Sequence, residues 1–240
     1  MKQKSRTEYS VMNTTVAFLA QTLAIFMGFF TRVVFTRTLS EGYVGINGLF
    51  TDILNILSLS ELGVGTAITY ALYAPIARRD IKKQQILMRM FRNFYRITAG
   101  FVLLAGLCLI PFLDILMKDR PDVNHLIIIY LLYLLNSVVS YLLIYKKTLV
   151  DAHQMNYITV MYHNGFLVLQ DILQIMVLFL TRNFILFLVI AVICTIIGNI
   201  CMSRKADRLF PYLKEPCKEQ LPQEERHDIL RNVKAMLMHK

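Results

Sequence analysis

Four ionisable residues stand inside long apolar segments of this sequence, and their types determine which chemistry those segments could support. They are Arg32, Asp52, Glu61 and Asp171. A charged group is costly in the apolar part of a membrane, so it faces the interior of a helix bundle or a water-filled cavity. An arginine there can bind an anion, and a carboxylate can pair with a cation or exchange a proton. We therefore take these four residues as candidates for lining a cavity.

Two of the four are expected at comparable depth in the membrane. Arg32 lies near the outer end of the first apolar segment, and Asp52 lies near the outer end of the second. Consecutive spans run antiparallel, so a salt bridge between these two residues is one interpretation. The other is that Arg32 extends its aliphatic stem and places its guanidinium at the outer membrane interface. The sequence leaves both interpretations open.

Glu61 lies deeper, within the stretch ILNILSLSELGVGTAITY. Nine residues separate it from Asp52, so on an ideal helix of about 3.6 residues per turn the two acids point in nearly opposite directions. A bend or break in the helix is expected here, because the carboxylate is flanked by Ser58, Ser60, Gly63 and Gly65. We expect Glu61 to cap amides freed by this break or to help the helices pack. A proton or cation site is the alternative.

Polar residues follow helical spacing in two further segments. Asn164, Asp171 and Gln174 are separated by seven and three residues, so they share one face of a helix. Asn136 and Ser140 are four residues apart and share a side of another helix. Such stripes join helices through hydrogen bonds or line a polar path. Joining helices is the commoner role, and Asn136, Asp171 and Gln174 are kept as cavity candidates.

The sequence shows no pattern typical of an enzyme, a metal site or a cofactor site. Its five histidines lack the spacing of metal ligands, its four cysteines form no CxxC pair, and it has no Walker A, HExxH or GxSxG motif. Asp119 and Asp122, on either side of Pro121, are expected to form a turn. We therefore predict a protein that is not an enzyme and that needs neither a metal nor a cofactor.

The composition indicates an all-α polytopic membrane protein. Of its 240 residues, 56% are hydrophobic and 18% are charged, and the mean hydropathy is +0.50. A soluble domain of this size would hold about 25% charged residues. The apolar residues fall into blocks long enough to cross a hydrocarbon core of about 30 Å. Six transmembrane helices are predicted, at Val11 to Phe35, Val44 to Tyr73, Tyr95 to Met117, His125 to Tyr145, Tyr157 to Leu180 and Phe184 to Met202.

The distribution of basic residues predicts the orientation of this bundle. Of the 26 Lys and Arg residues, 21 fall at the two ends of the chain and in the connections after the second and fourth spans. Cytoplasmic segments carry such an excess, so both termini are predicted to lie in the cytoplasm. The basic connection 78–96 is expected to be helical and to lie near the inner membrane surface. Topology and contacts with anionic membrane lipids account for the net charge of +10 without a nucleic-acid partner.

Two regions are predicted along the chain. Residues 1–212 form the six-helix transmembrane lobe, and residues 213–240 form a polar linker followed by an amphipathic helix. The helix is predicted from the helical spacing of Ile229, Val233, Met236 and Leu237. It could lie on the membrane surface or lead into a further span.

Three stretches carry a resemblance to a known family. They are EGYVGINGLFTDILNILSLSELGVGTAITYALYAPIARRD, FFTRVVFTRTLSEGYVG and YLLNSVVSYLLIYKKTLVDAHQMNYI. The chain resembles, over about residues 10 to 212, the polysaccharide and oligosaccharide-lipid flippases of the multidrug/oligosaccharidyl-lipid/polysaccharide exporter superfamily. The likeness is strongest at Glu61-Leu62-Gly63.

The resemblance implies a function and a partner. Members of the family move undecaprenyl-pyrophosphate-linked oligosaccharides across the cell membrane during bacterial surface polysaccharide synthesis. They have two six-helix lobes around a cavity that is often cationic, and one lobe rocks against the other. By analogy, Arg32 would meet the anionic substrate. The chain corresponds to the N-terminal lobe only, so a second lobe or a second copy of the chain is expected as a partner.

Two other functions are open on the sequence. One is a cation-coupled drug exporter of the same superfamily, which would need Asp52, Glu61 or Asp171 as its ion site. The other is a membrane scaffold within a polysaccharide assembly complex that does not itself transport. A membrane enzyme fits the sequence less well than any of these, because no catalytic motif is present.

Overall fold

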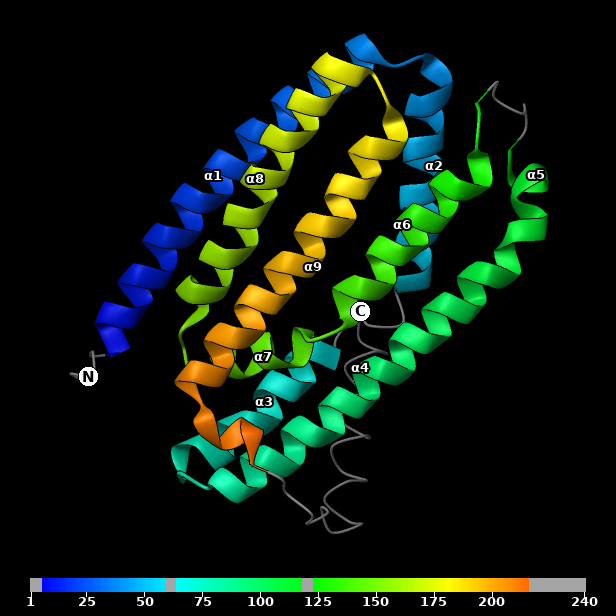
Figure 1. Cartoon of the computed structure of the whole chain (residues 1–240). Helices are drawn as coiled ribbons and strands as arrows, with labels where there is room; N and C mark the ends of the chain where they lie inside the picture. The colour runs from blue at the N-terminus through cyan, green and yellow to red at the C-terminus, as the bar shows by residue number, and fades with distance from the viewer. Residues whose placement is uncertain (1–5, 59–63, 118–122, 216–240) are drawn as a thin grey trace.

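A computed structural model describes residues 6–58, 64–117 and 123–215 of the chain, and all regular structure in these ranges is helical (Figure 1). The predicted all-α class is therefore confirmed. The α-helices are α1 (Arg6–Thr38), α2 (Glu41–Ser58), α3 (Val64–Ala77), α4 (Ile81–Leu109), α5 (Leu113–Leu116), α6 (Leu126–Tyr141), α7 (Ile144–Ala152), α8 (Asn156–Thr181) and α9 (Phe184–Leu209). Two 3-10 helices, η2 (Ile110–Phe112) and η3 (Pro211–Lys214), extend α4 and follow α9.

Five helical stretches in the described part of the chain are long and apolar enough to cross a membrane. They are Ser10–Thr38, Ile81–Phe112, Leu126–Ala152, Asn156–Thr181 and Phe184–Leu209. Large apolar side chains cover the outside of the bundle, and on α1 the exposed fraction is 70% for Phe18 and 64% for Phe29. Such a surface is stable in lipid and would be unfavourable in water. The chain is embedded in a membrane.

Three of the predicted spans differ from the observed helices. The second predicted span contains two shorter helices, α2 and α3, on either side of residues 59–63. These five residues, Glu61 among them, lie outside the described residues. The basic connection 78–96 is helical as expected, but it continues into the third span as the single helix α4. The fourth predicted span is broken at Leu142 and Leu143 into α6 and α7. The predicted amphipathic helix near residue 229 lies outside the described residues.

Side-chain caps fix where two of these helices begin. Asn183 accepts hydrogen bonds from the amides of Ile185 and Leu186 at 2.9 and 3.2 Å, and so begins α9 directly after α8. Asp80 accepts from the amide of Lys83 at 2.9 Å and begins α4. Both caps satisfy amides that have no partner within the helix. They keep the connections α3–α4 and α8–α9 short.

The break between α6 and α7 depends on an unusual backbone conformation at Leu143. Its φ is 71°, in the left-handed region of backbone conformation that residues other than glycine rarely adopt. The preceding residue, Leu142, is extended and ends α6. Together these two residues redirect the chain, so that α7 packs against α3, α4, α8 and α9. The direction of α7 decides where the side chains on it point, as described below.

The helices pack side by side in a layered bundle (Figure 1). α1 lies along α8, α8 packs against α9, α9 against α6, and α6 against α4 and α2. α3 and α7 lie near the end of the bundle where α4 begins and α9 ends. We call this the basic end, because it carries Arg78, Arg79, Lys82, Lys83, Lys146, Lys147, Arg204, Lys205 and Arg208.

Aromatic rings fill the core between α2, α4 and α6. The rings of Phe50 and Tyr130 meet edge to face with centroids 5.1 Å apart, and both side chains are fully buried. The Tyr130 hydroxyl donates to the carbonyl oxygen of Gly106 at 2.8 Å, and the Tyr133 hydroxyl donates to the side-chain oxygen of Asn47. These hydrogen bonds satisfy polar groups that water does not reach, and they join α6 to α4 and α2.

A second set of contacts fastens the segment after α9 to α4 at the basic end. The Tyr212 hydroxyl donates to Gln84 Oε1 at 2.5 Å, and Gln85 Nε2 donates to the Tyr212 carbonyl at 2.6 Å. Burial raises the pKa of Tyr212 to about 12, so the phenol remains a donor at neutral pH. The imidazole of His153 stacks on Phe210 with centroids 4.3 Å apart. The α7–α8 connection, α9 and α4 are thereby held together.

The close approach of α4 and α6 predicts an effect of substitution at Gly106. A Cβ at this residue would lie 2.3 Å from Leu134 Cδ1, and Leu134 is buried and has little room to move. Gly106→Ala is therefore expected to destabilise the fold by about 1–3 kcal/mol. Gly100→Ala on the same helix is the matched control, because a Cβ there has no atom within 4 Å. Thermal unfolding in detergent should show a lower Tm only for Gly106→Ala. Equal Tm values for the two variants would contradict the packing described here.

The stacked imidazole predicts a dependence of stability on pH. Burial lowers the pKa of His153, while the hydrogen bond from its Nδ1 to the Leu149 carbonyl at 2.9 Å opposes this shift only in part. Below the ordinary histidine pKa of about 6.5 the unfolded chain gains a proton that the folded chain resists, so stability falls. Tm should therefore decrease between pH 7 and pH 5, and decrease less in His153→Phe. Parallel pH profiles of the two proteins would exclude this effect.

Candidate functional site

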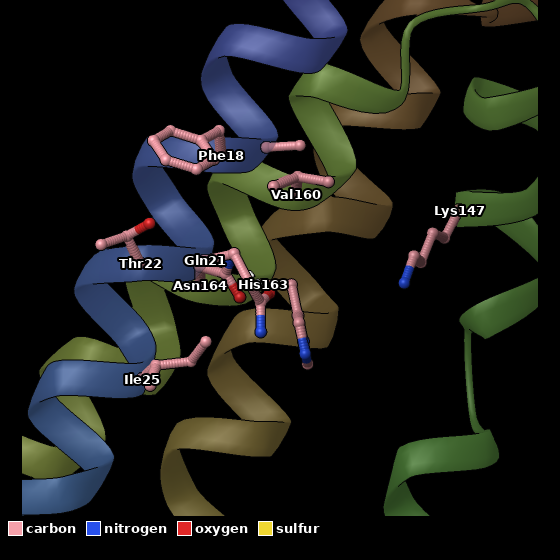
Figure 2. A pocket seen from close by; sticks show the side chains of 9 residues that line it. Phe18, Gln21, Thr22, Ile25, Lys147, Val160, His163 and Asn164 are labelled. Carbon is pink, nitrogen blue, oxygen red and sulfur yellow. Dashed lines mark hydrogen bonds between the residues drawn. The ribbon is translucent and has the colours of Figure 1, made fainter.

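A cavity of about 470 Å³ lies between α1, α7 and α8 (Figure 2). Its wall on α1 is formed by Ala17, Phe18, Gln21, Thr22 and Ile25, and its wall on α8 by Val160, His163 and Asn164. Lys147 closes it from α7, and its side chain extends toward the pair formed by α1 and α8 (Figure 2). One side of this cavity is therefore mostly apolar, and the other carries an ammonium group.

A second cavity, of about 360 Å³, lies between α6, α7, α8 and α9. It shares Lys147 and His163 with the first, so the two cavities meet at these side chains. Its other polar residues are Asn136, Ser140, Thr159, Tyr162, Gln170, Thr195 and Asn199. Hydroxyl and amide groups from α6, α8 and α9 thus surround the region beside the lysine. We call the two cavities together the Lys147 cavity.

The neighbouring lysines of α7 have different surroundings. Lys146 forms an ion pair with Asp207 of α9, with 2.8 Å between Nζ and Oδ2. For Lys147 the structure shows no ion pair or hydrogen bond to any described residue. Asp151, one turn further along α7, acts on it electrostatically, but the Oδ1 of this acid accepts a hydrogen bond from Thr159 at 2.6 Å. Lys146 is thus part of the fold, whereas Lys147 has a free donor group facing the cavity.

Two amides on the cavity wall differ in how their polar atoms are satisfied. Asn199 donates to the carbonyl of Val139 at 3.1 Å and so links α9 to α6. The side-chain oxygen of Asn136 is buried but has no hydrogen-bond partner in the described part of the chain. A buried polar atom of this kind is normally satisfied by water or a ligand. The side-chain oxygen of Asn136 is therefore an acceptor available to water or to a ligand in the inner cavity.

Asn136 is the predicted site residue that lines this cavity. Arg32 lies on α1, exposed, with its guanidinium 5.7 Å from the centre of the Phe35 ring. Asp52 is exposed on α2, and no ion pair joins it to Arg32 in the structure. The position of Glu61 is not among the described residues.

The polar stripe of α8 makes contacts with its neighbouring helices. Asn164 donates to Gln21 of α1 at 3.5 Å, and Asp171 accepts from the hydroxyl of Thr31 of α1 at 3.0 Å. Gln174 is buried and donates to the carbonyl of Phe187 of α9 at 2.9 Å. In this structure Asp171 and Gln174 hold α8 to α1 and α9, and neither lines the Lys147 cavity.

Sequence reasoning missed the two residues at the centre of the cavity. Lys147 was counted as a charge that sets membrane orientation, and His163 as one of several scattered histidines. The sequence does hold one indication for His163, because this residue directly precedes Asn164 and adjoins the polar face of α8. Nothing in the sequence marks the turn at Leu143 that aims Lys147 at this helix.

The described residues contain no group of three or more His, Cys, Asp or Glu side chains arranged to hold a metal ion. The chemistry of the site is that of hydrogen-bond donors and one ammonium group beside an apolar wall. Comparisons of the chain with protein-family models, with curated proteins and with solved structures find no match. The function is therefore inferred from the residues and their geometry.

The contrast between the two lysines predicts unequal effects of their substitution on stability. Lys146→Gln leaves Asp207 without its cation, and the other oxygen of Asp207 is already buried without a partner. The free energy of unfolding should therefore decrease by about 1–3 kcal/mol. Lys147→Gln removes no ion pair or hydrogen bond to a described residue, only a longer-range attraction to Asp151, and should change stability by less than about 0.5 kcal/mol. Thermal unfolding of both variants in the same detergent tests this. A larger decrease in Tm for Lys147→Gln would show that this lysine is structural.

Proposed function

We propose that this chain forms one lobe of a transporter that flips a lipid-linked anionic oligosaccharide across the cell membrane. The observation that carries the proposal is the free ammonium of Lys147, which faces the apolar wall that α1 contributes to the same cavity. A lipid-linked oligosaccharide has an apolar chain, an anionic phosphate group and a polar sugar. The apolar wall on α1 matches the apolar chain, and the ammonium of Lys147 matches the phosphate group. The hydroxyls and amides of the inner cavity match the sugar.

The electrostatics of the cavity favour an anionic ligand. An ammonium group inside a membrane protein is costly unless an opposite charge or several hydrogen-bond acceptors compensate it. Asp151 acts on Lys147 electrostatically without forming an ion pair with it. A phosphate group in the cavity would supply the missing negative charge and acceptor oxygens. Neutral groups such as the hydroxyls of Tyr162 and Thr195 could bind sugar hydroxyls.

The position of Arg32 fits movement of such a ligand along α1. Gln21 of α1 lines the Lys147 cavity, and Arg32 lies eleven residues further along the same helix, about 16 Å at 1.5 Å per residue. Lys147 belongs to the basic end of the bundle, which the positive-inside rule assigns to the cytoplasm. In the proposed cycle the anion meets Lys147 first and Arg32 near the outer side.

The resemblance in sequence agrees with this assignment and adds the missing partner. In the flippases that the chain resembles, two lobes enclose the substrate and rock against each other. The exposed apolar face of α1, with Phe18 and Phe29, is available to lipid or to such a second lobe or second copy. The proposed substrate is an undecaprenyl-pyrophosphate-linked oligosaccharide of surface polysaccharide synthesis.

The proposal is tested by complementation of a bacterial strain that lacks its polysaccharide flippase. The protein containing this lobe should restore surface polymer, whereas Lys147→Gln should lower polymer yield by about tenfold, the effect of losing roughly 1.4 kcal/mol of a charged contact. Lys147→Arg keeps the charge and should retain most export. Membrane levels of all proteins are measured by immunoblot.

Two results would contradict the proposal. One is full export by Lys147→Gln, which would remove the cavity from the transport path. The other is failure of the unmodified protein to restore polymer in any flippase-deficient strain while it expels cationic dyes, which would favour the drug-exporter alternative. Expression of the 240-residue chain by itself shows in addition whether it needs a second lobe.

A further inference from the structure

The lipid-facing side of α4 changes from cationic to apolar along a single stripe. Arg89, Asn93 and Arg96 are exposed in the first half of the helix, and Leu103 and Leu107 follow on the same side with exposed fractions of 39% and 40%. The helix runs without interruption from Ile81 to Leu109 and contains no acidic residue. Its basic half is therefore a cationic surface that continues directly into a surface for acyl chains.

Two exposed tyrosines indicate where this stripe crosses the membrane interface. Tyr70 and Tyr73 of α3 meet edge to face at 6.3 Å, and both are exposed. α3 packs against α4, and Gln84 donates to the carbonyl of Pro75 at 3.3 Å, which fixes how the two helices are aligned. From this alignment the tyrosines lie beside about residues 86–89 of α4. Exposed tyrosines are typical of the headgroup region, so Arg92 and Arg96 lie at its inner boundary.

Arg92 adds an unsatisfied donor at this level. Its side chain is half-buried at the edge of the stripe, and its Nε is buried with no hydrogen-bond partner among the described residues. The buried Nε is out of reach of a lipid, so it is the terminal amino groups of this guanidinium, which lie in one plane, that match the oxygens of a phosphate. Arg96, one turn further along and exposed, brings a second guanidinium to the same side of α4.

We propose that Arg92 and Arg96 form a binding site for the phosphodiester headgroup of an anionic phospholipid. The acyl chains of this lipid lie along Leu103 and Leu107, which are seven and eleven residues beyond Arg96 and therefore on its side of the helix. The occupant follows from charge and level, because a phosphodiester at the membrane interface with apolar chains below it complements both halves of the stripe. The site is on the outer flank of the bundle, distinct from the Lys147 cavity, and its existence does not depend on what the protein transports.

The test compares lipid binding by two double variants with matched changes in charge. Arg92→Gln/Arg96→Gln removes the proposed site. Arg204→Gln/Arg208→Gln removes two exposed cations from α9 at the same basic end. Each protein is placed in nanodiscs of phosphatidylcholine alone or of phosphatidylcholine and phosphatidylglycerol in equal parts. Retained phosphatidylglycerol is counted by native mass spectrometry, and Tm is measured in both lipids.

The unmodified chain is expected to retain phosphatidylglycerol and to gain Tm in the mixed nanodisc. Arg92→Gln/Arg96→Gln should bind it about 25-fold more weakly, which corresponds to a roughly fivefold loss for each cation. It should also lose the gain in Tm, while the α9 variant keeps both properties. Arg92→Lys/Arg96→Lys, which keeps the charge, should bind with intermediate affinity.

Three outcomes would overturn the proposal. Equal loss in the two Gln double variants would mean that the lipid responds only to the total charge of the basic end. Unchanged binding by Arg92→Gln/Arg96→Gln would place the lipid elsewhere. Displacement of phosphatidylglycerol by free glycerol phosphate would show a site for soluble phosphate rather than for a membrane lipid.

Discussion

Hydrogen bonds from side-chain amides and hydroxyls of one helix to its neighbours hold this bundle together. In lipid, helices gain little from burying apolar surface, because the acyl chains are as apolar as leucine. Specific association must therefore come from close packing and from polar contacts. Gln174 to Phe187, Asn199 to Val139 and Tyr130 to Gly106 are such contacts, and each uses a backbone carbonyl as acceptor. A carbonyl has a second lone pair, so these bonds form without breaking the helix that provides it.

The same constraint explains why the Lys147 cavity is polar. Between α6, α7 and α8, two of the inward-facing side chains have polar atoms without a close partner among the described residues. Asn136 then has an oxygen without a partner, and Lys147 has an ammonium group without an acid in contact. Tight polar contacts and open polar groups thus alternate within one bundle. The first kind determines its shape, and the second kind leaves donors available to a ligand.

Much of the fold follows directly from the sequence. α8 begins and ends within one residue of its predicted bounds, and α9 begins at the predicted Phe184 after the cap at Asn183. α9 then continues seven residues beyond the predicted end at Met202, because the polar residues that follow remain helical. The helical character of the basic connection before residue 96 was also predictable from its lack of glycine and proline. Its continuity with the third span was not, since a change in polarity along a helix resembles the end of a span.

The candidate site was less predictable, for reasons that concern single residues. Asn164 and Gln174 stood out as polar residues at helical spacing, and the structure explains them as contacts between helices. Lys147 did not stand out, because near a membrane surface a lysine is ordinary. Its role depends on the left-handed conformation of Leu143, and leucine carries no turn signal of the kind that glycine, asparagine or proline would give.

That turn also limits how the chain can vary. Each residue added to or removed from a helix rotates everything after it by about 100°. One insertion between Leu143 and Lys147 would bring a different side chain to the cavity and turn the ammonium toward α9 or toward lipid. A substitution within this short stretch changes one side chain, whereas a change in its length changes the register of all of α7. We therefore expect related chains to tolerate differences in residue type here far better than differences in length.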